Sequence, residues 1–103
     1  MDSRVCVTIE KNTLTLSGII DFDSIHSVDA LGNEWLGNLV EQDCYIDLES
    51  VTYSNSAGLV LLLAWLRIAY NHKKNLHIRS FPNSLKALVK VSGLDGLFAS
   101  MEG

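Results

Sequence analysis

The run DCYIDLESVTYSNSAGLVLLLAWLRIAYNHKKNLHIR, residues 43–79, decides the fold of this 103-residue chain. It begins with the short apolar segment Asp43 to Leu48, which is typical of a buried strand, followed by turn-forming residues from Ser50 to Asn55. A helix is predicted from about Ser56 to His72, and the alternating segment Asn75 to Arg79 predicts another strand. Strand, helix and strand in this order predict a right-handed crossover between parallel strands.

The sequence upstream of this run adds a hairpin and a helix. Val5 to Ile9 and Thr13 to Gly18 have the pattern of two strands joined by a tight turn. Apolar residues recur at helical spacing from Ser24 to Val40, although Gly32 and Gly37 weaken that helix.

The sequence downstream predicts a last helix, which starts at Pro82-Asn83 and ends near Gly93, a residue typical of a helix C-terminal cap. The apolar side chains between Gly93 and Phe98 are expected to fold back onto the core. The resulting order is β-β-α-β-α-β-α. We therefore expect an α/β protein with a mixed, mostly parallel β-sheet of about four strands and helices packed on it, as a single domain over residues 1–103.

Composition limits the function. Hydrophobic residues make up 48% of the chain and charged residues 19%, which is typical of a folded protein. The formal net charge of -4 opposes nucleic-acid binding. The longest uncharged apolar run, Ala57 to Leu66, is about half of the ~20 residues that span a bilayer, so direct membrane insertion is not expected. No secretory signal precedes Val5, which predicts a cytoplasmic protein.

Motifs for catalysis, cofactors or metals are missing from the sequence. The segment Ser54 to Gly58 lacks the first glycine of a nucleophile elbow, and nothing places His26, His72 or His77 beside a serine. No phosphate-binding loop or metal-ligand spacing of histidines occurs. We expect no enzyme activity, no cofactor and no metal.

Cysteines and acids also have structural explanations. Cys6 and Cys44 each lie in a strand-like segment, where a buried thiol acts as a small hydrophobic group. The carboxylates of Asp21, Asp23 and Asp29 could form an acid/base set, but acids near a helix start more often serve its positive dipole.

The start of the central helix is the strongest candidate site. Asn55 and Ser56 are both good N-caps, and capping could be their whole role. The first turn also carries partial positive charge, which favours a phosphate on Ser56 or a carboxylate of a partner. Ala57 and Gly58 are small and are expected to leave this turn sterically open.

The central helix is apolar on two sides. At 3.6 residues per turn, one face is expected to pack on the sheet, and it holds Leu59, Leu62, Leu63, Leu66 and Tyr70. The opposite side holds Leu61, Ala64, Trp65 and Ile68. Either neighbouring helices cover this second side, or a partner protein covers it with a large aromatic residue as the anchor.

Several motifs carry a family resemblance. The strand from Tyr45 to Leu48 and the segment Asn55 to Leu59 resemble the hallmark region of STAS domains. Gly18-Ile19-Ile20-Asp21 resembles the motif that follows the family's second strand, and Ser92 to Phe98 resembles its closing motif. The order and spacing of these pieces cover nearly the whole chain and imply the STAS fold.

Within the family, the length and the run from Leu59 to Arg67 look most like the STAS subunit of the Mla phospholipid ABC transporter of Gram-negative bacteria. That resemblance implies a non-catalytic accessory subunit that binds the transporter's ATPase at the inner face of the inner membrane, in a system that maintains outer-membrane lipid asymmetry. With the helix analysis, it predicts a partner-binding set of Asn55, Ser56, Ala57, Gly58, Leu61 and Trp65.

Two alternatives stay open. The first is an anti-sigma factor antagonist, in which a serine kinase phosphorylates the residue matched by Ser56 and so breaks a complex with an anti-sigma factor. Those proteins usually have Asp-Ser at this site, whereas this chain has Asn55-Ser56. The second is a small-ligand-binding module, for which no convergent set of polar residues argues.

Overall fold

A single four-stranded sheet organises the protein. The computed structural model describes residues 5–99, with side chains described for residues 5–98. The strands lie in the order β1-β2-β3-β4. The elements are β1 (Val5–Glu10), β2 (Thr13–Ile20), α1 (Ile25–Asn38), β3 (Asp43–Ser54), α2 (Ser56–Asn71), β4 (Asn75–Arg79), α3 (Asn83–Val91) and α4 (Asp95–Ala99).

The pairing of the strands confirms the mixed, mostly parallel sheet. β1 and β2 form the predicted antiparallel hairpin, with Glu10 opposite Thr13. β2 pairs with β3 and β3 with β4 in parallel, as the two crossovers through α1 and α2 require. The α/β class and the order of elements as far as α3 are therefore as predicted.

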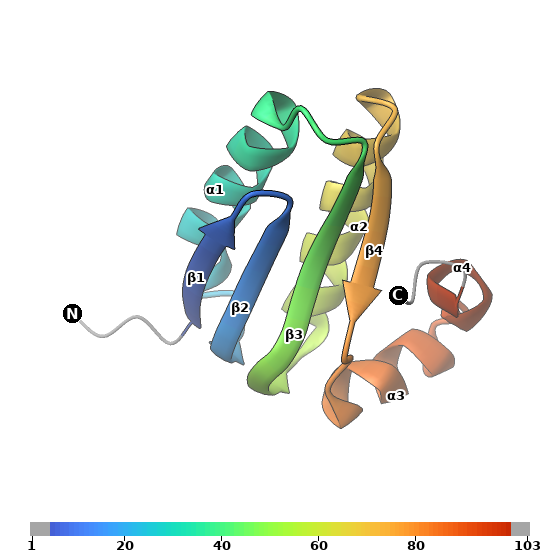
Figure 1. Ribbon diagram of the computed structural model, residues 1–103. Coiled ribbons are helices and arrows are strands. Elements are labelled where there is room, and N and C mark those ends of the chain that lie inside the picture. The colour runs from blue at the N-terminus through green and yellow to red at the C-terminus, as the bar shows by residue number, and fades with distance from the viewer. Residues whose placement is uncertain (1–4, 100–103) are drawn as a thin grey trace.

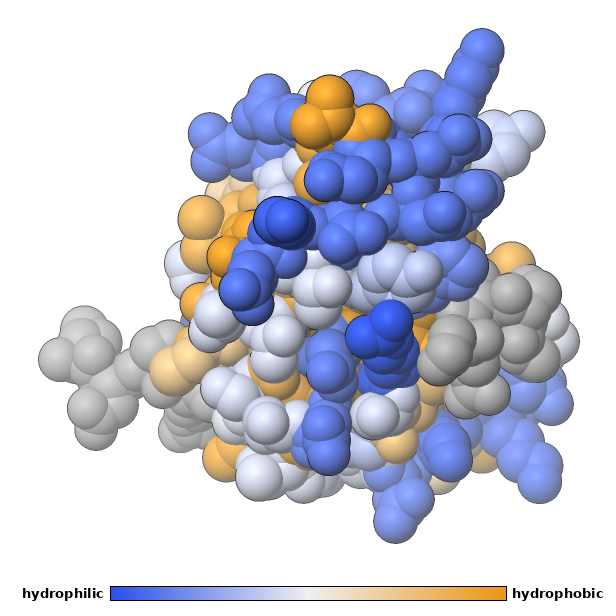
Figure 2. All heavy atoms as spheres, in the orientation of Figure 1, coloured by the Kyte–Doolittle hydropathy of each residue, from blue (hydrophilic) through white to orange (hydrophobic). Residues whose placement is uncertain are grey.

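The sheet separates a buried face from an open face. Figure 1 shows α1 and α2 side by side behind the strands, while α3 and α4 lie beyond the end of β4. Apolar side chains of the strands alternate toward these helices and form the core with them; they include Leu14, Leu16, Cys44, Ile46, Leu48, Leu76 and Ile78. The face turned to the viewer in Figure 2 is largely hydrophilic over the strands, which is the pattern of a sheet that is covered on one side.

Aromatic and charged side chains line the open face where β3 meets β4. Tyr45 stacks on His77 across the two strands, with ring centroids 4.8 Å apart, and Arg79 lies 4.2 Å from the Tyr45 ring centre. His77 Nε2 lies 3.2 Å from Asp43 Oδ1. This hydrogen bond lowers the pKa of the exposed Asp43 carboxyl. Such cross-strand pairs stabilise a sheet face that has no helix above it.

The strand β3 is longer than the sequence predicts. The segment Ser50 to Asn55 was expected to form a turn, but β3 continues to Ser54 beside the end of β2. Two register shifts in this pairing accommodate the extra residues, and Gly18 adopts φ 95° at the second shift. The prediction of a turn was wrong because polar residues here face away from the core, and the β-branched and aromatic residues from Val51 to Tyr53 favour a strand.

The C-terminal segment closes one edge of the core. Gly93 has φ 73° and its N–H donates to Lys90 O, which confirms it as the predicted C-terminal cap of α3. The residues that follow form the short helix α4, which was not predicted as a helix. Phe98 is buried as expected and meets Phe81 edge to face, whereas Leu97 remains exposed.

Candidate protein-docking site

Asn55 caps the helix α2. Its Oδ1 accepts a hydrogen bond of 2.8 Å from the N–H of Ala57, and its carbonyl accepts one of 3.0 Å from Gly58. The N–H of Asn55 donates to Ile20 O, which ties the start of α2 to the end of β2. Two N–H groups of the first turn are thus already satisfied within the chain, so fewer of them are available to an anion than the sequence suggested.

Ala57 and Gly58 lie inside the protein. Both are buried, so the expectation that they leave the first turn open to a partner was wrong. A Cβ on Gly58 would collide with the Ser54 hydroxyl. Ser54 is itself fully buried and donates to Asn55 O, while its N–H donates to Ser84 Oγ of α3. The glycine therefore lets α2 approach the end of β3 closely.

Ser56 is the exposed member of the first turn. Within residues 5–99, its hydroxyl makes no hydrogen bond, because Asn55 and not Ser56 supplies the cap. The half-buried Asn55 and the exposed Ser56 are the members of the predicted set that a partner can reach.

Leu61 and Trp65 do not form an exposed patch. They are 2% and 0% exposed, and the Trp65 indole N–H lies 3.4 Å from Asp29 O of α1. Gly32 of α1 packs on the Trp65 ring so closely that a Cβ there would overlap it. The neighbouring helix α1 thus covers the second apolar side of α2, and the alternative of an exposed aromatic anchor was wrong for Trp65.

The face of α2 that was expected to lie on the sheet is also displaced. Tyr70, assigned to that face, is 80% exposed. The helical wheel gave the wrong orientation because α2 buries the face toward α1 and the sheet together, so its most buried residues include Leu61, Leu62, Trp65 and Ala69. An almost uniformly apolar helix leaves its orientation undetermined by sequence alone.

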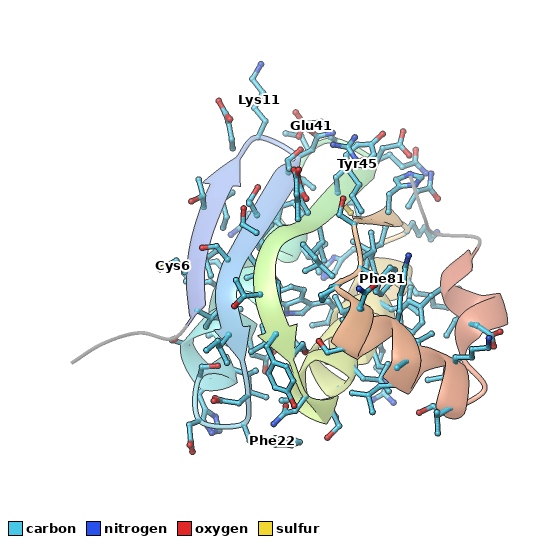
Figure 3. All side chains as sticks on the ribbon, turned by 90° about the horizontal axis from the view of Figure 1, so that it is seen from below. Cys6, Lys11, Phe22, Glu41, Tyr45 and Phe81 are labelled. Atoms are coloured by element: carbon cyan, nitrogen blue, oxygen red, sulfur yellow. The ribbon has the colours of Figure 1, made fainter. Side chains whose placement is uncertain are left out.

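Exposed apolar side chains lie at the end of the molecule where β2 and β3 end and α2 begins, and the sequence did not identify them. Ile19 and Tyr53 are partners in the β2·β3 register, and Phe22 follows β2. Figure 3 shows Phe22 at the end of the molecule where β2 and β3 both end. Val60 lies one turn beyond Ser56 on the same face of α2. We call these five residues, Ile19, Phe22, Tyr53, Ser56 and Val60, the Ser56 surface; its apolar members are 37–51% exposed.

The other candidate groups are dispersed. Asp21 Oδ1 accepts from the N–H groups of Asp23 and Ser24 in the turn before α1, and no acid lies in the first turn of α1 itself. Cys6 is exposed on the open face, against expectation, whereas Cys44 is buried.

In the part of the chain that is described, no group of three metal-binding side chains comes together. None of the helices there has the length and apolar character of a membrane span.

Comparisons with known proteins agree with this geometry. The family model described as "Mlab, STAS domain" matches residues 5–100. The anti-sigma-B factor antagonist of Staphylococcus aureus is 32% identical over 62 residues, which is 60% of this chain and 57% of that protein. The chain thus spans little more than half the length of the curated relatives it matches.

Solved structures show the same fold. A chain of the Acinetobacter MlaFEDB complex in its ATP-bound Vtrans2 conformation, MlaB, superposes with a TM-score of 0.78 at 23% identity, over 89% of this chain and 95% of that one. An anti-sigma factor antagonist from Mycobacterium paratuberculosis superposes with a TM-score of 0.71 at 19% identity, over 91% and 80%. Because a family model matches nearly all of the sequence, the chain belongs to the Mlab, STAS domain family.

Proposed function

We propose that the protein is a non-catalytic accessory subunit of a phospholipid-transporting ABC complex, which binds the transporter's ATPase through the Ser56 surface. The observation that carries this proposal is the set of exposed apolar side chains at the end of the molecule where α2 begins, because such side chains favour a protein partner over solvent. The family match and the likeness to MlaB, which covers nearly the whole of both chains, support the kind of partner.

The chemistry of the site supports docking over catalysis. Ser54 is buried and committed to Asn55, and His77 contacts Asp43 on the open face of the sheet, away from α2. No base is therefore arranged to activate Ser56 within the described residues. In this proposal the ATPase holds the protein at the inner face of the inner membrane, and the assembly serves lipid asymmetry of the outer membrane.

Asn55 bears on how the site is regulated. Its amide caps α2 as an aspartate would, but it adds no negative charge beside Ser56. The N–H groups of Ala57 and Gly58 are occupied, so a phosphate on Ser56 would find fewer donors there. These features favour a constitutive docking site over a phosphorylation switch.

A binding experiment with the ABC ATPase of the same organism tests the proposal. Ser56→Glu places a charge within the Ser56 surface at the start of α2, and Val60→Asp places one a turn further on. Each is expected to lower co-purification of the ATPase by tenfold or more, because the charge must be desolvated at the interface. Val40→Asp is the matched control, since Val40 is 91% exposed in the connection between α1 and β3. Undiminished binding by both site variants would contradict the proposal.

The second candidate is an anti-sigma factor antagonist. It is favoured by the sequence match to the Staphylococcus aureus antagonist and by the exposed hydroxyl of Ser56. It predicts stoichiometric phosphorylation of Ser56 by a partner serine kinase and release of an anti-sigma factor. Intact mass after incubation with candidate kinases, with Ser56→Ala as the control, distinguishes it from constitutive docking.

A further inference from the structure

One buried carboxylate oxygen has no hydrogen-bond donor. Oδ1 of Asp29, in the second turn of α1, is shielded from solvent and is unpaired within residues 5–99. The Asp29 side chain as a whole is half-buried, so its other edge remains reachable. An unpaired buried acceptor is unfavourable for the isolated fold and is uncommon in native proteins. Because this cost has no compensating contact in the isolated chain, a role of Asp29 in binding another molecule would explain it.

Asp29 lies at the contact between α1 and α2. Its backbone carbonyl accepts from the Trp65 indole, and Gly32, one turn further along α1, packs on the Trp65 ring. Both helices begin at the same end of the sheet, after the parallel strands β2 and β3. The side chain of Trp65 leans toward the start of α2, as long side chains in helices do, and so reaches the second turn of α1.

This position adjoins the outward face of α2. Exposure rises around α2 from the buried Trp65 through the half-buried Ala64 to the exposed Val60. Ser56, Val60 and Ala64 are four residues apart and share one face. Because α1 and α2 start together, Asp29 lies at about the level of Val60. A protein that covers Ser56 and Val60 thus extends naturally over Asp29.

The charge of this region selects the partner's chemistry. The helix α1 contains the acids Asp29 and Glu34 and no Lys or Arg, and the chain carries a net charge of -4. Arg67, the cation of α2, is exposed, and no ion pair joins it to Asp29 in the described structure. A carboxylate with an unused acceptor oxygen is the natural receptor for an arginine or lysine of another chain.

We propose that Asp29 is the polar anchor of the docking surface and accepts a hydrogen bond from a cationic side chain of the partner protein. This inference rests on the proposed docking at the Ser56 surface and adds the partner's charge and a second contact on α1. In the complex the partner's cation binds the reachable edge of this carboxylate and neutralises a charge that the isolated chain leaves without a buried donor at Oδ1. Asp29 therefore serves binding at the expense of the stability of the free protein.

Asp29→Asn and Asp29→Ala test this anchor with the ABC ATPase as the probe. Both are expected to weaken binding by about tenfold or more and to reduce its dependence on salt, since a charge-assisted hydrogen bond is lost. The melting temperature of the free protein is expected to stay unchanged or to rise, most clearly for Asp29→Ala, which removes the unpaired acceptor. Glu34→Gln is the matched control, because Glu34 lies on α1 beside the pocket lined by Ile9 and Leu31.

The two readouts separate the possible failures. If both Asp29 variants lower the melting temperature by several degrees and bind no worse than Glu34→Gln, Asp29 is structural and the anchor is refuted. If Ser56→Glu and Val60→Asp weaken binding while the Asp29 variants do not, the anchor fails and the proposed docking stands. Unchanged binding in all four variants refutes both.

Discussion

The two cysteines differ in reactivity because their strands place them on opposite faces of the sheet. Cys44 is fully buried among apolar residues, with its thiol 3.5 Å from Asn75 O, and Cys6 lies on the open face of the sheet. Burial raises the pKa of the Cys44 thiol to about 11, because the thiolate would lose its hydration. Cys44 therefore stays a protonated thiol through the neutral range, whereas Cys6 is open to reagents.

Thiol titration measures this difference. In the native protein at pH 8, one thiol, Cys6, is expected to react promptly with a disulfide reagent, and the second is expected to react on unfolding in urea. Cys6→Ser is expected to leave almost no fast-reacting thiol, and Cys44→Ser to leave one. Fast reaction of both thiols in the folded protein would show that the strand β3 is not packed as described.

The candidate site was predicted partly at the level of single residues. Asn55 and Ser56 could be identified as candidate caps because capping is local. The residue type alone shows which side chain can accept a hydrogen bond from the first turn of the helix. The exposure of Ile19, Phe22 and Tyr53 could not, because it depends on where two strand ends meet. The burial of Trp65 likewise depends on Gly32, a residue 33 positions earlier in another helix.

At the scale of elements, α1 contains two glycines with different roles. Gly32 of α1 lies directly against the ring of Trp65 of α2. For Gly37, a Cβ would meet its nearest neighbour, His72 Nε2, at 4.0 Å, which is an ordinary contact. The sequence showed both as equally unfavourable for a helix, but only Gly32 is required by packing.

Replacing each glycine by alanine separates the two roles. Gly32→Ala is expected to lower the free energy of unfolding by about 1–3 kcal/mol, because the added methyl group forces α1 and α2 apart. Gly37→Ala is expected to raise it by up to about 1 kcal/mol through helix propensity. Urea unfolding followed by circular dichroism measures both. Equal stabilisation by the two substitutions would show that Trp65 does not pack on Gly32.

Element boundaries followed the sequence where local signals were strong. The strand Asn75–Arg79 and the start of α2 were predicted at their exact residues, since alternation and a capping asparagine mark them. The end of β3 was not predicted. The last residue of β3 that pairs with β4 is Asp47, and beyond it β3 pairs with β2 alone. Polar residues in this part of the strand are therefore exposed. Polar composition there indicated a turn although the backbone is paired.

At the scale of the whole molecule, the core is shared between the sheet, α1, α2 and the C-terminal segment. Phe98 of α4 is buried and meets Phe81, with centroids 5.6 Å apart and planes at 74°. Leu85 and Val89 of α3 belong to the same core as the strands. This continuity predicts that the described chain unfolds as one cooperative unit, which is also the test of the expected single domain.

Phe98→Ala tests that cooperativity from the far end of the fold. It is expected to lower the free energy of unfolding by about 3 kcal/mol, through lost burial and the cavity that remains. Trp35 and Trp65 lie in α1 and α2, so their fluorescence reports on a part of the core remote from α4. In one cooperative unit, the urea transitions by fluorescence and by circular dichroism shift together.

Leu97→Ala is the control, because Leu97 is next to Phe98 in the sequence but 43% exposed, and it should shift both transitions far less. A fluorescence transition that Phe98→Ala leaves unchanged would mean that α4 is a separate unit docked on an independently stable core.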